Sequence, residues 1–256
     1  MVATAIMLDQ EIRTASIHFP SEDVQIRAYL AEPVGAGPFP AVIVFQEIFG
    51  VNVHIRDITE RIAKEGYVAI APHLYQRIGP DFESGYTPED IQIGKQYKAQ
   101  TVAAELLSDT RAAIVYLQSL PRVQAGSIGA IGFCFGGHVA YLAATLPEIT
   151  ATASFYGAGI STWTPGGGPP TLSRTAEIKG IIYAFFGTQD KSIPTKEVQQ
   201  IQTELEKHSI RHRIFHYPGE HGFFCDQRAS YDPEAAVDAW NHVKQLFQKN
   251  LTSPKQ

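Results

Sequence analysis

A cysteine stands where the sequence predicts a sharp turn between a buried strand and a helix. Cys134 lies in the run GFCFGG (residues 132–137), after the apolar segment 127–133 and before a helical pattern over residues 136–145. Such a turn strains its central residue, and the residues two positions away on either side must be small, as Gly132 and Gly136 are. The amides that begin the helix favour a thiolate. We therefore expect Cys134 to be a nucleophile; the alternative is an inert buried thiol in a glycine-rich turn.

An acid and a base follow two later strand patterns in the order that such a nucleophile requires. Asp190 ends the turn GTQD after the apolar run 180–186, and His221 lies in PGEHG after the run 212–217. In open α/β sheets, ligands bind at the carboxyl ends of the strands, where both residues are expected. Taken alone, Asp190 could be an ordinary turn residue and His221 one of nine histidines on a polar surface. Position and chain order together favour a Cys-His-Asp triad.

This triad predicts acyl transfer to the thiol. His221 would receive the thiol proton while Asp190 orients the imidazole, and the thiolate would attack an ester or lactone carbonyl. The backbone N–H of Phe135 is expected to supply one oxyanion donor, and the N–H of Ile48, after the strand pattern PAVIVF, the other. Water would then hydrolyse an acyl-enzyme, with no cofactor or metal required.

Strand and helix patterns alternate along the chain. Strands are expected over residues 24–31, 40–45, 67–71, 127–133, 150–156, 180–186 and 212–217, and helices over 54–64, 99–120, 136–145, 195–207 and 233–247. This alternation predicts a mostly parallel sheet with helices on both faces. With the nucleophile turn, it indicates one α/β-hydrolase domain over residues 1–256, with a core at about 16–248.

Two segments fit neither pattern. Residues 79–94 and 159–175 are rich in Gly, Pro, Ser and Thr. Both are long for loops inside a compact domain, so we interpret them as candidate binding loops.

Composition and charge indicate which kinds of binding partner and which cellular setting to expect. The chain has 256 residues, is 44% hydrophobic and carries a formal net charge of −5 without a basic stretch, which argues against nucleic acid. Two cysteines give no disulfide framework or zinc spacing, and Cys225 is interpreted as a structural or incidental thiol. The spacing of His208, His212 and His216 is attributed to a strand face, so no metal is expected. Residues 1–10 show no signal peptide and no apolar run spans a bilayer, which predicts a cytoplasmic protein without membrane contact.

Four separated segments resemble the dienelactone hydrolase (carboxymethylenebutenolidase) family over about residues 16–247. They are QEIFGVN (46–52), PHLYQR (72–77), GFCFGG (132–137), and GTQD (187–190) taken with GEHG (219–222). The resemblance implies an α/β-hydrolase acting on a lactone that carries a carboxylate. It also implies that Glu47 interacts with the thiol and helps to activate it when substrate arrives; the alternative is a carboxylate on a surface loop.

The resemblance also implies residues that bind the substrate carboxylate. Arg77 matches the first of two family arginines, and Tyr75 in the same segment is a candidate beside it. Cys225 stands where the second arginine is expected, and Arg228, three residues further on, is a candidate substitute. Gly222 stands where dienelactone enzymes of the family carry a hydroxyl. These departures leave the triad intact and leave the natural substrate open. The sequence also leaves open whether the protein is a monomer or a small homo-oligomer.

Two other classes of function compete with an ester or lactone hydrolase: a silent scaffold, and an enzyme of different chemistry on the same fold. A silent scaffold that binds a small carboxylate is disfavoured because the Cys, Asp, His and Glu are all present. An enzyme of different chemistry could be a peroxidase or a dehalogenase. A dehalogenase needs a carboxylate nucleophile at the turn, where this chain has Cys134.

Overall fold

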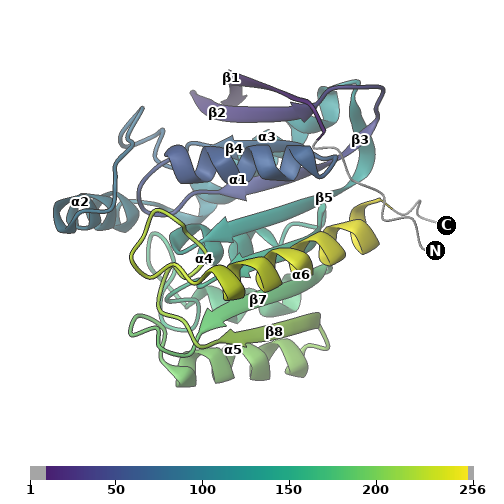
Figure 1. Cartoon of the computed structure of the whole chain (residues 1–256). Helices are drawn as coiled ribbons and strands as arrows, with labels where there is room; N and C mark the ends of the chain where they lie inside the picture. The colour runs from purple at the N-terminus through teal and green to yellow at the C-terminus, as the bar shows by residue number, and fades with distance from the viewer. Residues whose placement is uncertain (1–9, 253–256) are drawn as a thin grey trace, which may run out of the picture.

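A computed structural model of the chain describes residues 10–252 and shows one eight-stranded sheet between helices (Figure 1). The signal-peptide expectation falls mostly on residues 1–9, which lie outside the described part. The strands are β1 (Ile12–Ser21), β2 (Val24–Pro33), β3 (Phe39–Phe45), β4 (Val68–Pro72), β5 (Val123–Phe133), β6 (Ile149–Phe155), β7 (Ile181–Gly187) and β8 (Arg211–Tyr217).

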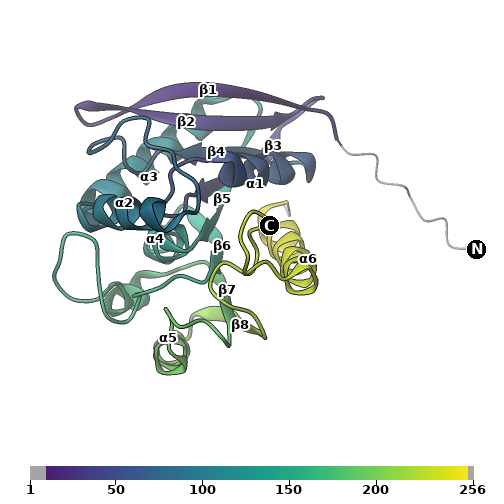
Figure 2. The ribbon, with the colours of Figure 1, turned by 60° about the vertical axis from the view of Figure 1, so that its left-hand side comes forward.

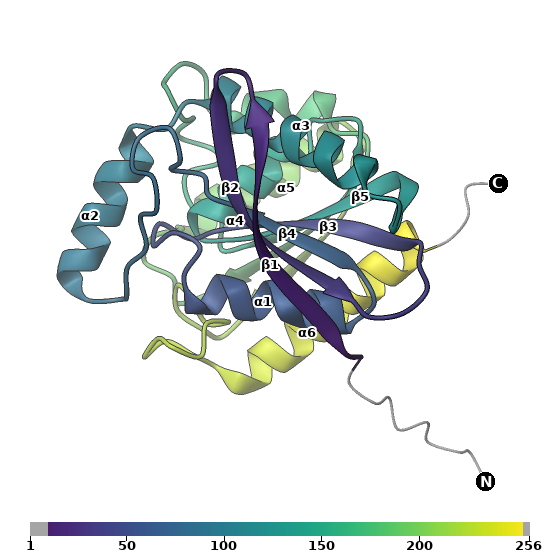
Figure 3. The same cartoon turned by 90° about the horizontal axis from the view of Figure 1, so that it is seen from above.

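The strand order is β1-β2-β4-β3-β5-β6-β7-β8. β1 pairs antiparallel with β2, and β2 antiparallel with β4, whereas every pair from β4 to β8 is parallel. The sheet twists strongly, so that β1 and β2 cross the direction of the other strands when seen from above (Figure 3). The predicted fold class, a mostly parallel α/β-hydrolase sheet, is confirmed.

Helices cover both faces of this sheet. α1 (Val53–Lys64) and α6 (Pro233–Leu251) lie on one face, and α3 (Ala103–Ser119), α4 (Phe135–Ala143) and α5 (Thr195–Lys207) on the other (Figure 2). Burial on both faces explains why β3 and β4 read as unbroken apolar runs. α1 turns Ile55, Ile58 and Ile62 inward at helical spacing, all of them buried. None of the described helices combines the length and apolar composition needed to cross a bilayer.

The structure departs from the predicted elements in three places. The edge strand β1 was not predicted, and the helix expected over residues 99–120 is α3, which begins only at Ala103. Residues 79–94 are not loop throughout, because α2 (Pro88–Ala99) begins inside them. Residues 159–175 are mostly turns and run into a short 3₁₀ helix (Thr171–Glu177).

The position of α2 matters for the site. It stands apart from the helices that cover the two faces, beside the carboxyl ends of the parallel strands (Figures 1 and 3). Thr87 and Asp90 cap its first turn reciprocally, and Pro88 occupies the start of the helix. Gly94 lets α2 approach the chain after β3, because a Cβ there would lie 2.5 Å from the carbonyl oxygen of Ile48.

Candidate active site

Cys134 sits on the strained turn that the sequence predicts. Its φ is 54° and its ψ −116°, a conformation that side-chain-bearing residues rarely adopt. A Cβ on Gly132 would lie 1.9 Å from the carbonyl oxygen of Gly136, so only glycine fits there. The Cys134 N–H donates to the carbonyl of Phe155 at 3.0 Å, which ties the turn to β6. The backbone therefore holds the thiol at the carboxyl end of β5, directly before α4.

Asp190 and His221 meet at the ends of β7 and β8. Asp190 Oδ2 lies 2.7 Å from Nδ1 of His221, while Oδ1 accepts from the Ser192 N–H at 2.7 Å. Two backbone bonds join the turns that carry them, one of which runs from the Gln189 N–H to the Gly219 carbonyl at 3.0 Å. The Asp190 side chain is fully buried. The imidazole is thereby fixed with Nδ1 toward the carboxylate, which leaves Nε2 for another partner.

The charge state of His221 reflects this setting. Burial disfavours the imidazolium, but the negative charge of a Cys134 thiolate and hydrogen bonds to Asp190 and the sulfur outweigh it and raise the pKa of His221 to about 10. Tyr156 packs edge-on against the imidazole, with ring centroids 5.1 Å apart.

Cys134 and His221 open into one cavity of about 580 Å³. This is the usual size of a site for a small organic molecule. Its apolar wall includes Ile48, Ile91 and Trp163, and three cationic side chains border it: Lys95, Lys98, Arg228. The segments that supply the wall include both regions predicted to be binding loops, 79–94 and 159–175.

Lys98 was not predicted as a site residue. Its Nζ lies 4.6 Å from the ring centroid of Trp163, a cation–π contact that holds the chain over the cavity. Burial lowers the pKa of Lys98, and the negative charge of Cys134 partly offsets this. The sequence signal that could have predicted Lys98 as a site residue is the helix cap at Thr87 and Pro88, which marks the start of α2. A helix from there places Lys95 and Lys98, three residues apart, on one face.

Glu47 lies behind the cavity wall and is completely buried. Arg228 Nη1 donates to its Oε1 at 3.2 Å, and the Tyr86 hydroxyl donates to its Oε2 at 3.2 Å. Glu47 is therefore not a surface carboxylate. Tyr86 also accepts from Asn52 Nδ2 at 3.1 Å and from the Cys225 thiol at 3.3 Å, so Cys225 is tied to the same network. Tyr86 was missed by sequence reasoning, because it lies in a segment interpreted as a loop.

Arg228 reaches both the cavity and Glu47 because residue 222 is glycine. A Cβ on Gly222 would lie 2.6 Å from Arg228 Nη1, and the φ of Gly222 is +82°. A hydroxyl-bearing residue at that position would occupy the space of the guanidinium. The two departures noted in the sequence, Gly222 and Cys225, thus accompany an arginine that enters from further along the loop.

Arg77 lies elsewhere. Its guanidinium donates to both oxygens of Asp109, at 3.2 and 2.8 Å, and also reaches the backbone oxygen of Ser21 at 3.4 Å. It does not line the cavity that holds Cys134. This geometry does not support the prediction that Arg77 binds the substrate, since the buried Asp109 carboxylate holds the guanidinium.

Tyr75 also stays out of the cavity lining. It is 2% exposed and stacks on Phe135, with ring centroids 6.1 Å apart. Burial, together with the charge of Cys134, raises the pKa of Tyr75 well above its ordinary value. Tyr75 therefore packs beneath the site rather than facing a substrate directly.

The two residues predicted to supply oxyanion donors belong to segments near Cys134. Phe135 is the first residue of α4, where an N–H has no partner inside the helix. Ile48 follows the end of β3 and lines the cavity. Phe135 thus adjoins Cys134 in the chain, and Ile48 shares the cavity with it.

Comparisons with known proteins agree with this architecture. Residues 26–251 match the family model described as "Dienelactone hydrolase family". A provisionally named carboxymethylenebutenolidase of Synechocystis sp. is 58% identical over 242 residues, which cover 94% of this chain and 98% of the relative. A Bradyrhizobium protein, provisionally named a 2-oxo-3-(5-oxofuran-2-ylidene)propanoate lactonase, is 33% identical over 84% of this chain and 86% of its own. A Klebsiella pneumoniae structure, provisionally titled a dienelactone hydrolase, superposes with a TM-score of 0.85 at 32% identity, covering 93% of this chain and 99% of that one.

Proposed function

Because the chain belongs to the dienelactone hydrolase family, whose members cleave lactone or ester bonds, we propose that it cleaves such bonds with a catalytic triad of Cys134, His221 and Asp190. The substrate in this proposal is a small ester or lactone that carries a carboxylate. One observation carries the proposal most: the 2.7 Å contact between Asp190 Oδ2 and His221 Nδ1 fixes an imidazole that shares its cavity with the Cys134 thiol. A buried acid, an oriented base and a nucleophile on a strained turn together support acyl transfer.

In the first half-reaction the sulfur attacks the carbonyl carbon. The carbonyl electron pair moves to oxygen, where the N–H groups of Phe135 and Ile48 stabilise the charge. As the tetrahedral intermediate collapses, the carbon–oxygen single bond of the ester or lactone breaks. The leaving oxygen takes the proton that His221 holds. With a lactone, the leaving oxygen stays attached to the acyl group, so the ring opens on the enzyme.

In the second half-reaction water completes the hydrolysis. Neutral His221 takes a proton from water as the water oxygen attacks the thioester carbon. The carbon–sulfur bond then breaks, the acid is released, and the proton on His221 restores the imidazolium beside the thiolate. The chemistry requires a free thiol at residue 134, which suits a reducing compartment such as the cytoplasm.

The cations around the cavity support a carboxylate-bearing substrate. Arg228 presents a planar guanidinium that fits a carboxylate in a two-bonded fork, and Lys98 offers a second positive charge from α2. The name of the Bradyrhizobium relative, a lactonase of an oxofuranylidene propanoate, describes a substrate with such a carboxylate. Of the binding residues that the sequence indicates, we retain Arg228 and add Lys98.

Glu47 links substrate binding to the thiol in this proposal. Arg228 neutralises Glu47 while no substrate is bound. A substrate carboxylate that pairs with Arg228 weakens this bond, and the freed Glu47 carboxylate then serves as a base that takes the thiol proton of Cys134.

The direct test compares a p-nitrophenyl ester with dienelactone, before and after treatment with iodoacetamide. We expect both activities to disappear on alkylation and to be absent from Cys134→Ala, whose circular dichroism spectrum should match that of the native protein. Hydrolysis that survives alkylation would remove Cys134 from the reaction. A folded protein with an accessible thiol and no turnover would favour the silent scaffold that binds a carboxylate.

A further inference from the structure

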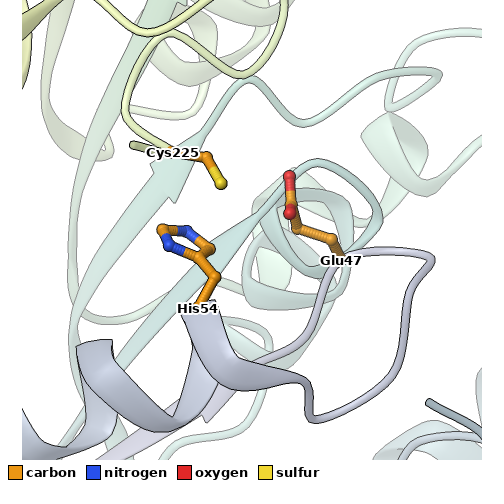
Figure 4. A group of neighbouring side chains, drawn as sticks. All are labelled: Glu47, His54 and Cys225. Atoms are coloured by element: carbon orange, nitrogen blue, oxygen red, sulfur yellow. The ribbon is translucent and has the colours of Figure 1, made fainter. Parts of the chain in front are cut away.

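Three potential metal ligands, none of which lines the cavity, converge around Glu47. Glu47 follows β3, His54 lies in the first turn of α1, and Cys225 belongs to the loop after β8. One ligand atom from each lies within 4.8 Å of the other two, and all three residues are buried. Figure 4 shows the side chains of Glu47, His54 and Cys225 facing one shared space.

His54 is the unexplained member of this group. It is 1% exposed, and neither ring nitrogen has a hydrogen-bond partner among the residues that the structure describes. Its ring packs edge-on against Phe133, with centroids 5.7 Å apart, which fixes the ring without bonding the nitrogens. A buried polar group without a partner costs about 1–3 kcal/mol. A neutral imidazole in this state has a free lone pair, which is what a metal ion takes.

We propose that Glu47, His54 and Cys225 bind a thiophilic divalent cation of the Zn²⁺ type. A thiolate, an imidazole and a carboxylate form a ligand set that Zn²⁺ accepts, with bonds of about 2.0–2.3 Å. Ligand atoms that already lie within 4.8 Å of one another reach one ion through small side-chain rotations. Water or a second carboxylate oxygen completes a tetrahedral shell.

The charges around the cluster support this assignment. Binding replaces the Cys225 thiol proton by a sulfur–metal bond and releases that proton to solvent. A divalent ion compensates both the carboxylate and the thiolate. Sequence reasoning expected no metal, because ligands drawn from residues 47, 54 and 225 leave no spacing motif.

A bound ion would also bear on catalysis. Glu47 Oε1 accepts from Arg228 at 3.2 Å, so an ion on Glu47 competes with the cation that borders the cavity. We expect Zn²⁺ at this site to inhibit hydrolysis. Metal binding itself does not rest on the proposed function, and the binding test below uses a variant without the nucleophile, so failure of one proposal is separable from failure of the other.

The experiment titrates Cd²⁺ into the full-length Cys134→Ser protein and follows the thiolate-to-metal charge-transfer absorbance. The variant removes the only other cysteine, so any such band reports Cys225. We expect one Cd²⁺ per chain, displaced by Zn²⁺. Adding Cys225→Ser should abolish the band, and adding His54→Ala should weaken binding at least about tenfold, as loss of a ligand or its supporting group does. His216→Ala, which removes an exposed imidazole from β8, is the matched control and should bind unchanged.

Two results would overturn the proposal. One is the absence of a charge-transfer band in folded Cys134→Ser at Cd²⁺ concentrations well above the protein concentration. The other is a band whose midpoint is the same with His54 and without it, which would reduce the site to a lone thiol. Circular dichroism identifies any variant that fails to fold, and His54→Gln then replaces His54→Ala, with the same weakening of Cd²⁺ binding expected.

Discussion

Arg228 donates from Nη1 to Oε1 of Glu47 at 3.2 Å, so one of the three cations that border the cavity also neutralises the buried carboxylate. A substrate carboxylate and Glu47 thus share one partner. This relationship connects ligand binding to the charge beside Cys134, and it depends on the empty space that Gly222 leaves.

Gly222→Ser should weaken that connection. The new Cβ would lie 2.6 Å from Arg228 Nη1 and would push the guanidinium away from Glu47. We expect kcat/KM for carboxylate-bearing esters to fall at least about tenfold, the equivalent of one lost charged hydrogen bond, with a smaller loss for neutral esters. Gly167→Ser is the control, because Gly167 has a similar φ of +86° and a Cβ there would meet no described atom within 4 Å. Equal losses for both ester classes would contradict the role of Arg228.

Arg77→Ala should affect stability rather than substrate binding. The substitution leaves the Asp109 carboxylate, 3% exposed, without the guanidinium that it binds. Breaking a buried pair in this way costs roughly 3 kcal/mol, which urea unfolding measures. Asp109→Asn in the same background should recover part of the loss. A selective rise in KM for carboxylate substrates, with unchanged unfolding, would restore Arg77 to the binding site.

Tyr86→Phe should lower activity while leaving the fold intact. The hydroxyl donates to Glu47 Oε2 at 3.2 Å, and its loss removes one of two bonds that position the carboxylate. A hydrogen bond to a charged group is worth about 1.5–3 kcal/mol, so we expect kcat/KM to fall about tenfold or more. Tyr116→Phe, on α3 and stacked on Phe19, is the matched control. Identical kinetics for the two variants would show that Tyr86 does not position Glu47.

The titration of His221 should report its charged neighbours. Its pKa is raised to about 10, above the ordinary 6.5. The imidazolium therefore stabilises the fold fully below pH 6.5, and this contribution is lost as pH rises through about 10. NMR of the imidazole should show a midpoint near that value in the native protein. In Cys134→Ala the midpoint should move downward, because the thiolate charge is gone while burial remains. A midpoint that is the same in both proteins would mean that no thiolate faces His221.

The parts of this molecule that were predictable are those in which local chemistry and position coincide. The turn at Cys134 needs glycines on both sides, and Asp190 and His221 each follow a strand pattern, which is apolar throughout in β7 and mixed in β8. α2 was missed because Gly94 is its only fully buried residue, so it shows no apolar stripe and only its cap at Thr87 marks it. β1 is an edge strand with mostly exposed side chains, which leaves a weak pattern.

Pairings between distant side chains were the least predictable. Arg77 follows a strand at the expected edge, yet Asp109 from α3 takes its guanidinium. The order of residues along the chain does not reveal which of two carboxylates an arginine will meet. Tyr86 and Lys98 joined the site only because α2 folds over the carboxyl ends of the strands.

A covalent bond from substrate to Cys134 is the central requirement of the proposed mechanism. Rapid mixing with p-nitrophenyl acetate should release a burst of about one nitrophenolate per chain, as acyl-enzyme formation predicts. Mass spectrometry of the quenched protein should place the acetyl group on the peptide that contains Cys134. Cys134→Ala should show neither burst nor adduct. Undiminished steady-state hydrolysis by Cys134→Ala, or an adduct on a different residue, would contradict the mechanism.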